Sequence, residues 1–169
     1  MLEHLGAYTI DADALAHRVI ARDAPGYKPV LDTFGLWLLD KDGQIDRRKL
    51  VRLVFSDSEA LGQLEDIIHP YVIQAVELRV KRASQKFVVI EAIKLLESGL
   101  GNQCNSIWVT YAPEQVQIER LVRKRGLSYE DARQRVRAQP AQKEKLGAAT
   151  IVIKNTGSYE DLWTQVSSA

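Results

Sequence analysis

Residues 8–13, Tyr8-Thr9-Ile10-Asp11-Ala12-Asp13, form a short apolar run that ends in two carboxylates. The run is rich in β-forming residues, and a helical spacing of apolar residues, including Leu15 and Val19, begins directly after it. We therefore predict a buried strand that delivers acids at its C-terminal end. In open α/β sheets the ligand crevice lies at that edge, which makes Asp11 and Asp13 candidate site residues. The same spacing also fits turn and N-cap residues of the following helix, and both interpretations stay open.

Further apolar runs of the same character occur later in the chain, at residues 87–91, 107–111 and 150–155. They are continuous rather than alternating, which is typical of a parallel sheet covered on both faces. Helices are predicted between them. Pro113 is expected at the first position of one helix, and capping-box patterns begin at Ser128 and Ser158. Strand–helix alternation with right-handed crossovers predicts a doubly wound, parallel-sheet α/β domain.

The segment between the first two predicted strands is expected to be mainly helical from its periodicity. The stretch Leu39–Ile45 contains an Asp-Gly pair and predicts a hairpin-like turn. Farther along, Asp57 is expected to cap a helix that Pro70 interrupts. The reason is that a residue before proline, here His69, disfavours the helical region of backbone conformation.

The composition is that of an ordinary globular domain. The 169 residues include 46% hydrophobic and 27% charged residues, with a formal net charge of +1. A balance so near neutral gives no case for nucleic acid or a membrane surface as a partner. The single cysteine, Cys104, excludes an internal disulfide and a multi-cysteine metal site within this chain. No apolar run is long enough to span a bilayer and residues 1–4 lack a basic leader, so we expect a cytoplasmic protein. The sequence gives no indication of oligomeric state.

Residues 120–145 form a local cationic segment in this near-neutral chain. They include nine Lys or Arg residues against three acids. Most charge runs are solvated helix faces, and the residues alone favour that interpretation. The second interpretation is a lid whose arginines neutralise phosphates.

Several motifs, taken together, resemble the dephospho-CoA kinase family, P-loop kinases of the nucleoside-monophosphate-kinase type. The likeness extends over essentially the whole chain. Each motif is weak alone, but in order and at family-like spacing they are fairly specific. The motifs are Ile10-Asp11-Ala12-Asp13, Phe55-Ser56-Asp57, Ile68-His69-Pro70, the stretch from Val89 to Glu97, Arg137-Ala138-Gln139 and Ile153-Lys154-Asn155-Thr156-Gly157.

The resemblance implies transfer of the γ-phosphoryl group of ATP to the 3′-hydroxyl of dephospho-CoA, the last step of coenzyme A synthesis. Mg²⁺ is expected with ATP, and no protein metal site is predicted. One kinase-like domain is implied over residues 1–169, with a helical acceptor-binding insertion at 26–84 and a lid at 120–145. Asp13 would be the catalytic carboxylate, orienting the attacking hydroxyl. The implied substrate-binding residues are Asp11, His69, Glu91 and Glu97, and the implied nucleotide and lid residues are Arg123, Lys124, Arg137, Gln139, Asn155 and Gly157.

Three of these assignments have simpler alternatives. His69 before a proline is also typical of a helix junction. Asn155 and Gly157, implied here to line the adenine site, are also residues that turns favour.

The chain also departs from the family pattern. Its 169 residues contain no Gly-x-x-x-x-Gly-Lys-Ser/Thr phosphate loop, on which positioning of the β- and γ-phosphates depends. Many relatives have Asp-x-Pro-Leu-Leu-x-Glu where this chain has Glu91-Ala92-Ile93-Lys94-Leu95-Leu96-Glu97, which puts a magnesium geometry at Glu91 in doubt. Lys124 stands at the first lid arginine, and a lysine cannot make the bidentate fork.

In the family, the strand before the phosphate loop lies between those expected here at 86–91 and 106–111. Without it, two inner strand edges would be unpaired. We therefore expect a natural protein that begins roughly 20–25 residues earlier, about the length of a strand, a phosphate loop and a helix. The chain as printed is expected to be a weak or inactive kinase. The alternatives are a non-catalytic protein that binds CoA-like ligands without a phosphate loop, and an interaction remnant.

Overall fold

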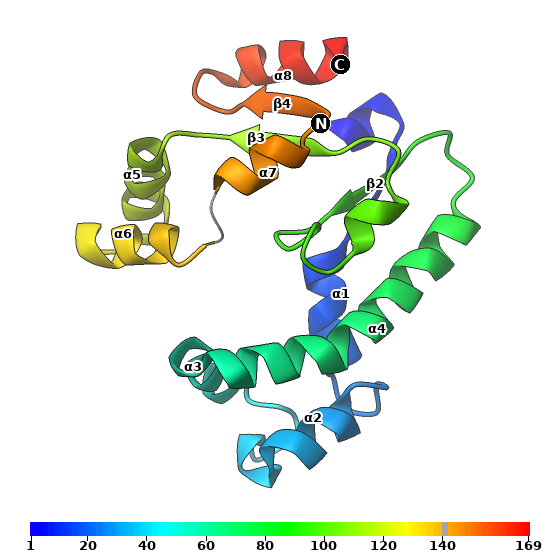
Figure 1. The fold of residues 1–169 in the computed structure, drawn as a ribbon, viewed down its shortest axis with the longest axis vertical. Coiled ribbons are helices and arrows are strands. Elements are labelled where there is room, and N and C mark those ends of the chain that lie inside the picture. The colour runs from blue at the N-terminus through cyan, green and yellow to red at the C-terminus, as the bar shows by residue number, and fades with distance from the viewer. Residues whose placement is uncertain (140–141) are drawn as a thin grey trace. The chain divides into compact units, whose positions relative to one another are not determined.

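The computed structural model describes residues 1–139 and 142–169 of the chain (Figure 1). Its backbone divides into two compact units, one of residues Leu2–Leu100 and one of Gly101–Ala169 together with Met1. Each unit is described by itself. The expected single domain over 1–169, with an insertion at 26–84 and a lid at 120–145, stays a prediction.

The unit Leu2–Leu100 contains both sequence-predicted early strands and a long helical segment between them. The short helical turn η1 (Leu2–Leu5) closes at Gly6, whose φ of +88° suits glycine. The elements that follow in the chain are β1 (Tyr8–Asp11), α1 (Ala12–Val19), α2 (Tyr27–Phe34), η2 (Leu36–Leu38), α3 (Arg47–Ser56), α4 (Ser58–Arg82), β2 (Val88–Glu91) and η3 (Leu100–Gln103), which continues past the unit boundary. As predicted, 27–84 is mainly helical, and an antiparallel bridge between Leu39 and Ile45 closes the turn at Gly43.

The core of this unit lies where β1, α1 and α4 meet. Strands β1 and β2 pair in parallel, with Tyr8 opposite Val88 and Asp11 opposite Glu91. Ile10 on the strand and Leu15 on α1 are buried, and they belong to one hydrophobic cluster with Val76 of α4. Apolar burial of this kind is the main stabilising contribution to such a unit.

Helix α4 corrects one prediction. Pro70 does not interrupt it, because the helix runs unbroken through this residue over Ser58–Arg82. Leu64 before the proline and Val72 after it are both buried in the core. Packing on both sides offsets the hydrogen bond that proline cannot donate within a helix. His69 is consequently a mid-helix residue, and the helix-junction interpretation is wrong.

The unit that begins at Gly101 contains the other two predicted strands, also as a parallel pair. Its elements are β3 (Trp108–Tyr111), α5 (Glu114–Arg125), α6 (Tyr129–Arg137), α7 (Gln142–Ala148), β4 (Ile151–Lys154) and α8 (Tyr159–Ser168). Trp108 lies opposite Ile151 and Tyr111 opposite Lys154. Ser158 forms the predicted capping box, and Ser128 accepts a hydrogen bond from the Asp131 amide. Pro113 is the N-cap residue rather than the first helical residue.

The parallel α/β class is confirmed, but the strands form two separate two-stranded sheets, β1–β2 and β3–β4. Within the described residues, β2 and β3 are each paired along one edge, and the other edge of each strand is unpaired. The sequence predicted an unpaired edge at each of these two strands. No helix in the described part of the chain is long and apolar enough to cross a membrane.

Candidate active site

Two acidic residues end the paired strands β1 and β2 at the same edge. Asp11 and Glu91 are register partners, and both side chains are exposed. Asp11 is also the N-cap of α1, because its Oδ1 accepts a hydrogen bond of 2.7 Å from the Ala14 amide. The register of the two strands therefore brings these acids to one edge of the pair. Of the two interpretations of Asp11, helix capping has a contact to support it, and substrate binding stays a prediction.

Asp13 lies in the first turn of α1 with an exposed side chain. Its Oδ2 accepts a hydrogen bond of 3.3 Å from the backbone amide of Ile93, in the segment that follows β2. A helix N-terminus favours a carboxylate, since the amides of the first turn carry partial positive charge. The fold thus brings Asp13 to the carboxyl edge of the β1–β2 pair, the edge at which Glu91 ends β2.

The segment after β2 is attached to α4 by an ion pair that the sequence analysis missed. The Lys94 ammonium pairs with the Glu65 carboxylate, and their side chains are 35% and 23% exposed. The two residues are 29 positions apart. No local pattern links residues so distant, so single-sequence reasoning had no signal for the pair. Glu97 lies farther along this segment and is exposed.

His69 lies in the middle of α4 and is half-buried. The structure gives it no hydrogen bond or ion pair with the other residues it describes, and Ile68 beside it packs against the core. Its implied contact with the substrate stays a prediction.

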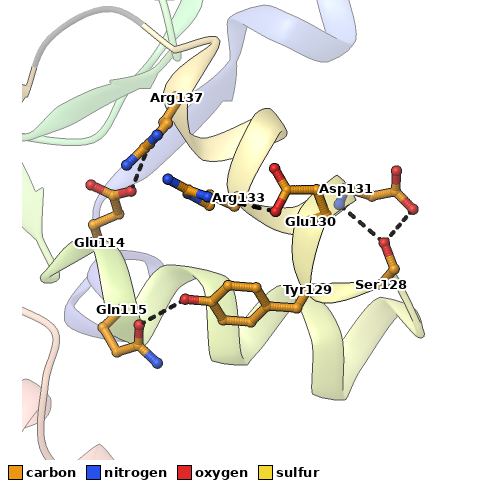
Figure 2. Close-up of polar contacts among 8 residues, drawn as sticks. All are labelled: Glu114, Gln115, Ser128, Tyr129, Glu130, Asp131, Arg133 and Arg137. Carbon is orange, nitrogen blue, oxygen red and sulfur yellow. Dashed lines mark hydrogen bonds and ion pairs between the residues drawn. The ribbon is translucent and has the colours of Figure 1, made fainter.

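Basic lid residues lie on the helices α5 and α6, and Figure 2 shows those of α6, Arg133 and Arg137. Arg123 and Lys124 occupy the exposed last turn of α5. Arg137 ends α6, and its Nε donates a hydrogen bond of 3.1 Å to Oε1 of Glu114 at the start of α5. Arg133, one turn earlier, pairs with Glu130 at 3.6 Å.

A shallow groove on α6 is lined by both of these arginines, Arg133 and Arg137, with Glu130 and Gln134. Gln139 follows the helix and is exposed, and its amide donates to the Val136 carbonyl. The rest of the predicted lid includes residues 140 and 141, which lie outside the described residues. The cationic segment is therefore helical and largely exposed, as either interpretation requires.

Asn155 and Gly157 form a turn between β4 and α8. The Asn155 amide donates to the Tyr111 carbonyl at 2.8 Å, which extends the β3–β4 ladder. A Cβ at Gly157 would lie 2.4 Å from Oδ2 of Asp161. That carboxylate accepts hydrogen bonds from the Ser158 amide and hydroxyl, and they hold the pKa of Asp161 below its usual range. A side chain at position 157 would therefore displace the capping carboxylate of Asp161, and the role of this turn at an adenine site stays a prediction.

Comparisons with known proteins identify the family of this chain. A sequence model of the family described as dephospho-CoA kinase matches residues 1–161. The chain belongs to the dephospho-CoA kinase family. A curated dephospho-CoA kinase from Carboxydothermus hydrogenoformans is 37% identical over 169 residues, covering 98% of this chain and 82% of the relative. One from Aquifex aeolicus is 40% identical over 167 residues, covering 98% of this chain and 85% of the relative.

Solved structures similar to this chain include a dephospho-CoA kinase as well. A dephospho-CoA kinase from Campylobacter jejuni has a TM-score of 0.66 at 31% identity, covering 98% of this chain and 84% of that one. A Thermus thermophilus protein has a TM-score of 0.80 at 33% identity, covering 99% of this chain and 85% of that one. The resemblance inferred from the motifs and the P-loop-kinase-like α/β fold are both confirmed.

Proposed function

We propose that this dephospho-CoA kinase family member transfers the γ-phosphoryl group of ATP to the 3′-hydroxyl of dephospho-CoA in the cytoplasm. The observation that carries the proposal is the placement of Asp13 at the carboxyl edge of β1–β2, exposed and held by the Ile93 amide. Family membership over residues 1–161 supplies the reaction class. The single cysteine, Cys104, fits a reducing compartment.

In this proposal Asp13 accepts a hydrogen bond from the 3′-hydroxyl and orients its oxygen toward the γ-phosphorus. As the O–P bond forms, the hydroxyl proton passes to the Asp13 carboxylate and ADP leaves. Positioning and charge stabilisation, rather than strong basicity, account for most of the catalysis of phosphoryl transfer. Glu91 lies beside this point at the end of β2 and Glu97 a few residues on, and we assign both to the acceptor side.

In the same proposal, the basic side chains of α5 and α6 bind the phosphates of the nucleotide. Arg123, Lys124 and Arg137 present positive charge on exposed helix ends, and an arginine can bind two phosphate oxygens at once. Gln139 follows them in the chain. The turn at Asn155 and Gly157 is assigned to the adenine ring, and the half-buried His69 with the 26–84 insertion to the acceptor.

Mg²⁺ is proposed to enter with ATP rather than to occupy a site built by this chain. The described residues bring together no group of three His, Cys, Asp or Glu side chains that could hold a metal ion. Carboxylate oxygens are suitable ligands, but Glu91 alone does not make a coordination shell. No step is therefore assigned to a metal held by these residues.

The test is ADP formation dependent on dephospho-CoA, measured on the product of the natural gene and on its Asp13→Asn variant. We expect kcat to fall by about 100-fold or more, in the upper range of a general base contribution, with little change in melting temperature. Glu160→Gln is the matched control, because Glu160 is likewise the second residue of its helix, α8, and exposed. A normal rate for Asp13→Asn would refute the role of Asp13.

Calorimetry distinguishes the alternative of a non-catalytic protein that binds CoA-like ligands. Heat on titration with dephospho-CoA, together with no turnover in the unmodified gene product, would favour that alternative over a kinase.

A further inference from the structure

The hydrogen bond between Asp13 and Ile93 joins two elements that are far apart in the sequence. The Ile93 amide and the Asp13 carboxylate are 80 positions apart. Within residues 1–139 and 142–169, the structure gives the Asp13 side chain no other hydrogen bond or ion pair. One carboxylate oxygen, Oδ2, is therefore occupied by the protein, and the other, Oδ1, is left for a ligand.

An exposed aspartate with no partner samples several side-chain rotamers. A hydrogen bond from a backbone amide selects among them without adding another mobile side chain. The acceptor is a carboxylate, so this hydrogen bond is charge-assisted, although at 3.3 Å it is longer than most bonds of that kind. The Ile93 amide thus restricts the direction in which Oδ1 points.

The amide can do this only if its own position is fixed, and the chain fixes it from two sides. On one side, β2 ends at Glu91 in register with β1, two residues before Ile93. On the other, the next residue, Lys94, makes the ion pair with Glu65 of α4. Helix α4 in turn packs against α1, the helix that carries Asp13. A continuous series of contacts therefore leads from Asp13 through the Ile93 amide and the Lys94–Glu65 ion pair to α4, and from α4 back to α1.

Resting on the proposed function, we propose that the Ile93 amide is a positioning group for phosphoryl transfer, and that the Glu65–Lys94 pair holds it in place. The amide fixes Oδ2 of Asp13 so that Oδ1 receives the 3′-hydroxyl proton of the acceptor. Ile93, Lys94 and Glu65 are thus positioning residues, and their side chains do not touch the substrate.

Proline at position 93 tests the amide, because it removes the N–H while keeping an apolar side chain. Ile93→Pro is expected to lower kcat by about 10- to 100-fold, the scale of a misplaced catalytic group, with the KM for dephospho-CoA nearly unchanged. Ile93→Val keeps the N–H and is expected to keep most of kcat. Equal kcat values for the two variants would overturn the proposal.

The ion pair is tested by a double-mutant cycle. Lys94→Met and Glu65→Gln are each expected to lower kcat several-fold, and the double variant is expected to be no slower than the slower single variant. If the double variant instead lowers kcat by the product of the two single-variant factors, the two residues act independently. That result would overturn their part in the proposal.

A measurement without turnover separates this inference from the proposed function and from simple misfolding. In hydrogen–deuterium exchange, the Ile93 amide of the unmodified protein is expected to exchange more slowly than in Asp13→Ala, which removes its acceptor. Equal exchange rates of the Ile93 amide in the two proteins would overturn the contact. Absence of turnover in the unmodified gene product would instead overturn the proposed function.

Discussion

The packing of α4 makes a quantitative prediction about stability. Val76 is completely buried, while Val80, one turn later on the same helix, is 39% exposed. Replacing either by alanine deletes the same atoms from the same helix. At position 76 the change removes about 1.6 kcal/mol of apolar burial, at roughly 0.8 kcal/mol for each of two methyl groups. A cavity term adds to this loss, and the better helix propensity of alanine offsets part of it.

We therefore expect Val76→Ala to lower the free energy of unfolding by about 2 kcal/mol, and Val80→Ala to change it by less than about 0.5 kcal/mol. With an m-value of about 2 kcal/mol/M in urea, the first variant should unfold at a midpoint about 1 M lower. Trp37 lies in the same compact unit, so its fluorescence can report the transition once Trp108 and Trp163 are replaced by phenylalanine.

Because the same atoms are removed at both positions, the difference in unfolding midpoint between the two variants reports the difference in burial of the two valines. Similar midpoint shifts for Val76→Ala and Val80→Ala would show that α4 does not present Val76 to the core. The assignment of α4 to the β1–β2 unit would then be refuted, and with it the argument for the Glu65–Lys94 pair.

Three further predictions concern Pro70 and the turn before α8. Pro70→Ala is expected to stabilise the protein by about 1–3 kcal/mol and raise its helical circular dichroism, because an interior proline costs a helix about 3 kcal/mol; a loss of stability would contradict this. The pKa of Asp161 is lowered in the folded protein, so its stabilising effect is present above the unfolded-state pKa and is lost as the pH falls through the folded-state pKa. Exchange of the α8 amides should therefore speed up on acidification once the intrinsic pH dependence is removed, and Asp161→Asn, which removes the titrating group, should abolish this response. Gly157→Ala is expected to cost about 1 kcal/mol in urea unfolding, because its Cβ would collide with Asp161, and an unchanged midpoint would argue against that geometry.

The sequence predicted the secondary structure of this chain well because its signals there are local. Each continuous apolar run became a parallel strand, since β-branched residues favour strands. Ser158 and Asp57 cap their helices as expected. Pro70 was misjudged because a local rule was applied where burial on both sides of the proline decides the outcome.

The candidate site was only partly predictable, for the same reason. Asp11 and Asp13 became candidates because they stand at the end of a strand-forming run, and Glu91 was assigned through the family resemblance; the structure brings the ends of both strands to a common edge. The contacts that hold the site, from Ile93 and from Lys94 to Glu65, join positions 80 and 29 residues apart. Such pairs arise from tertiary packing, which one sequence does not record.

The junction between β1 and α1 has a consequence for how this family can vary in length. The strand ends at Asp11 and the helix begins at Ala12, with no residue between them. One inserted residue would rotate the start of α1 by about 100° relative to the strand. Ala12 and Leu15 would leave the core, and Asp13 would turn away from Ile93. Insertions and deletions should therefore be absent here among working relatives, and should collect instead in exposed turns such as Asp40–Gly43.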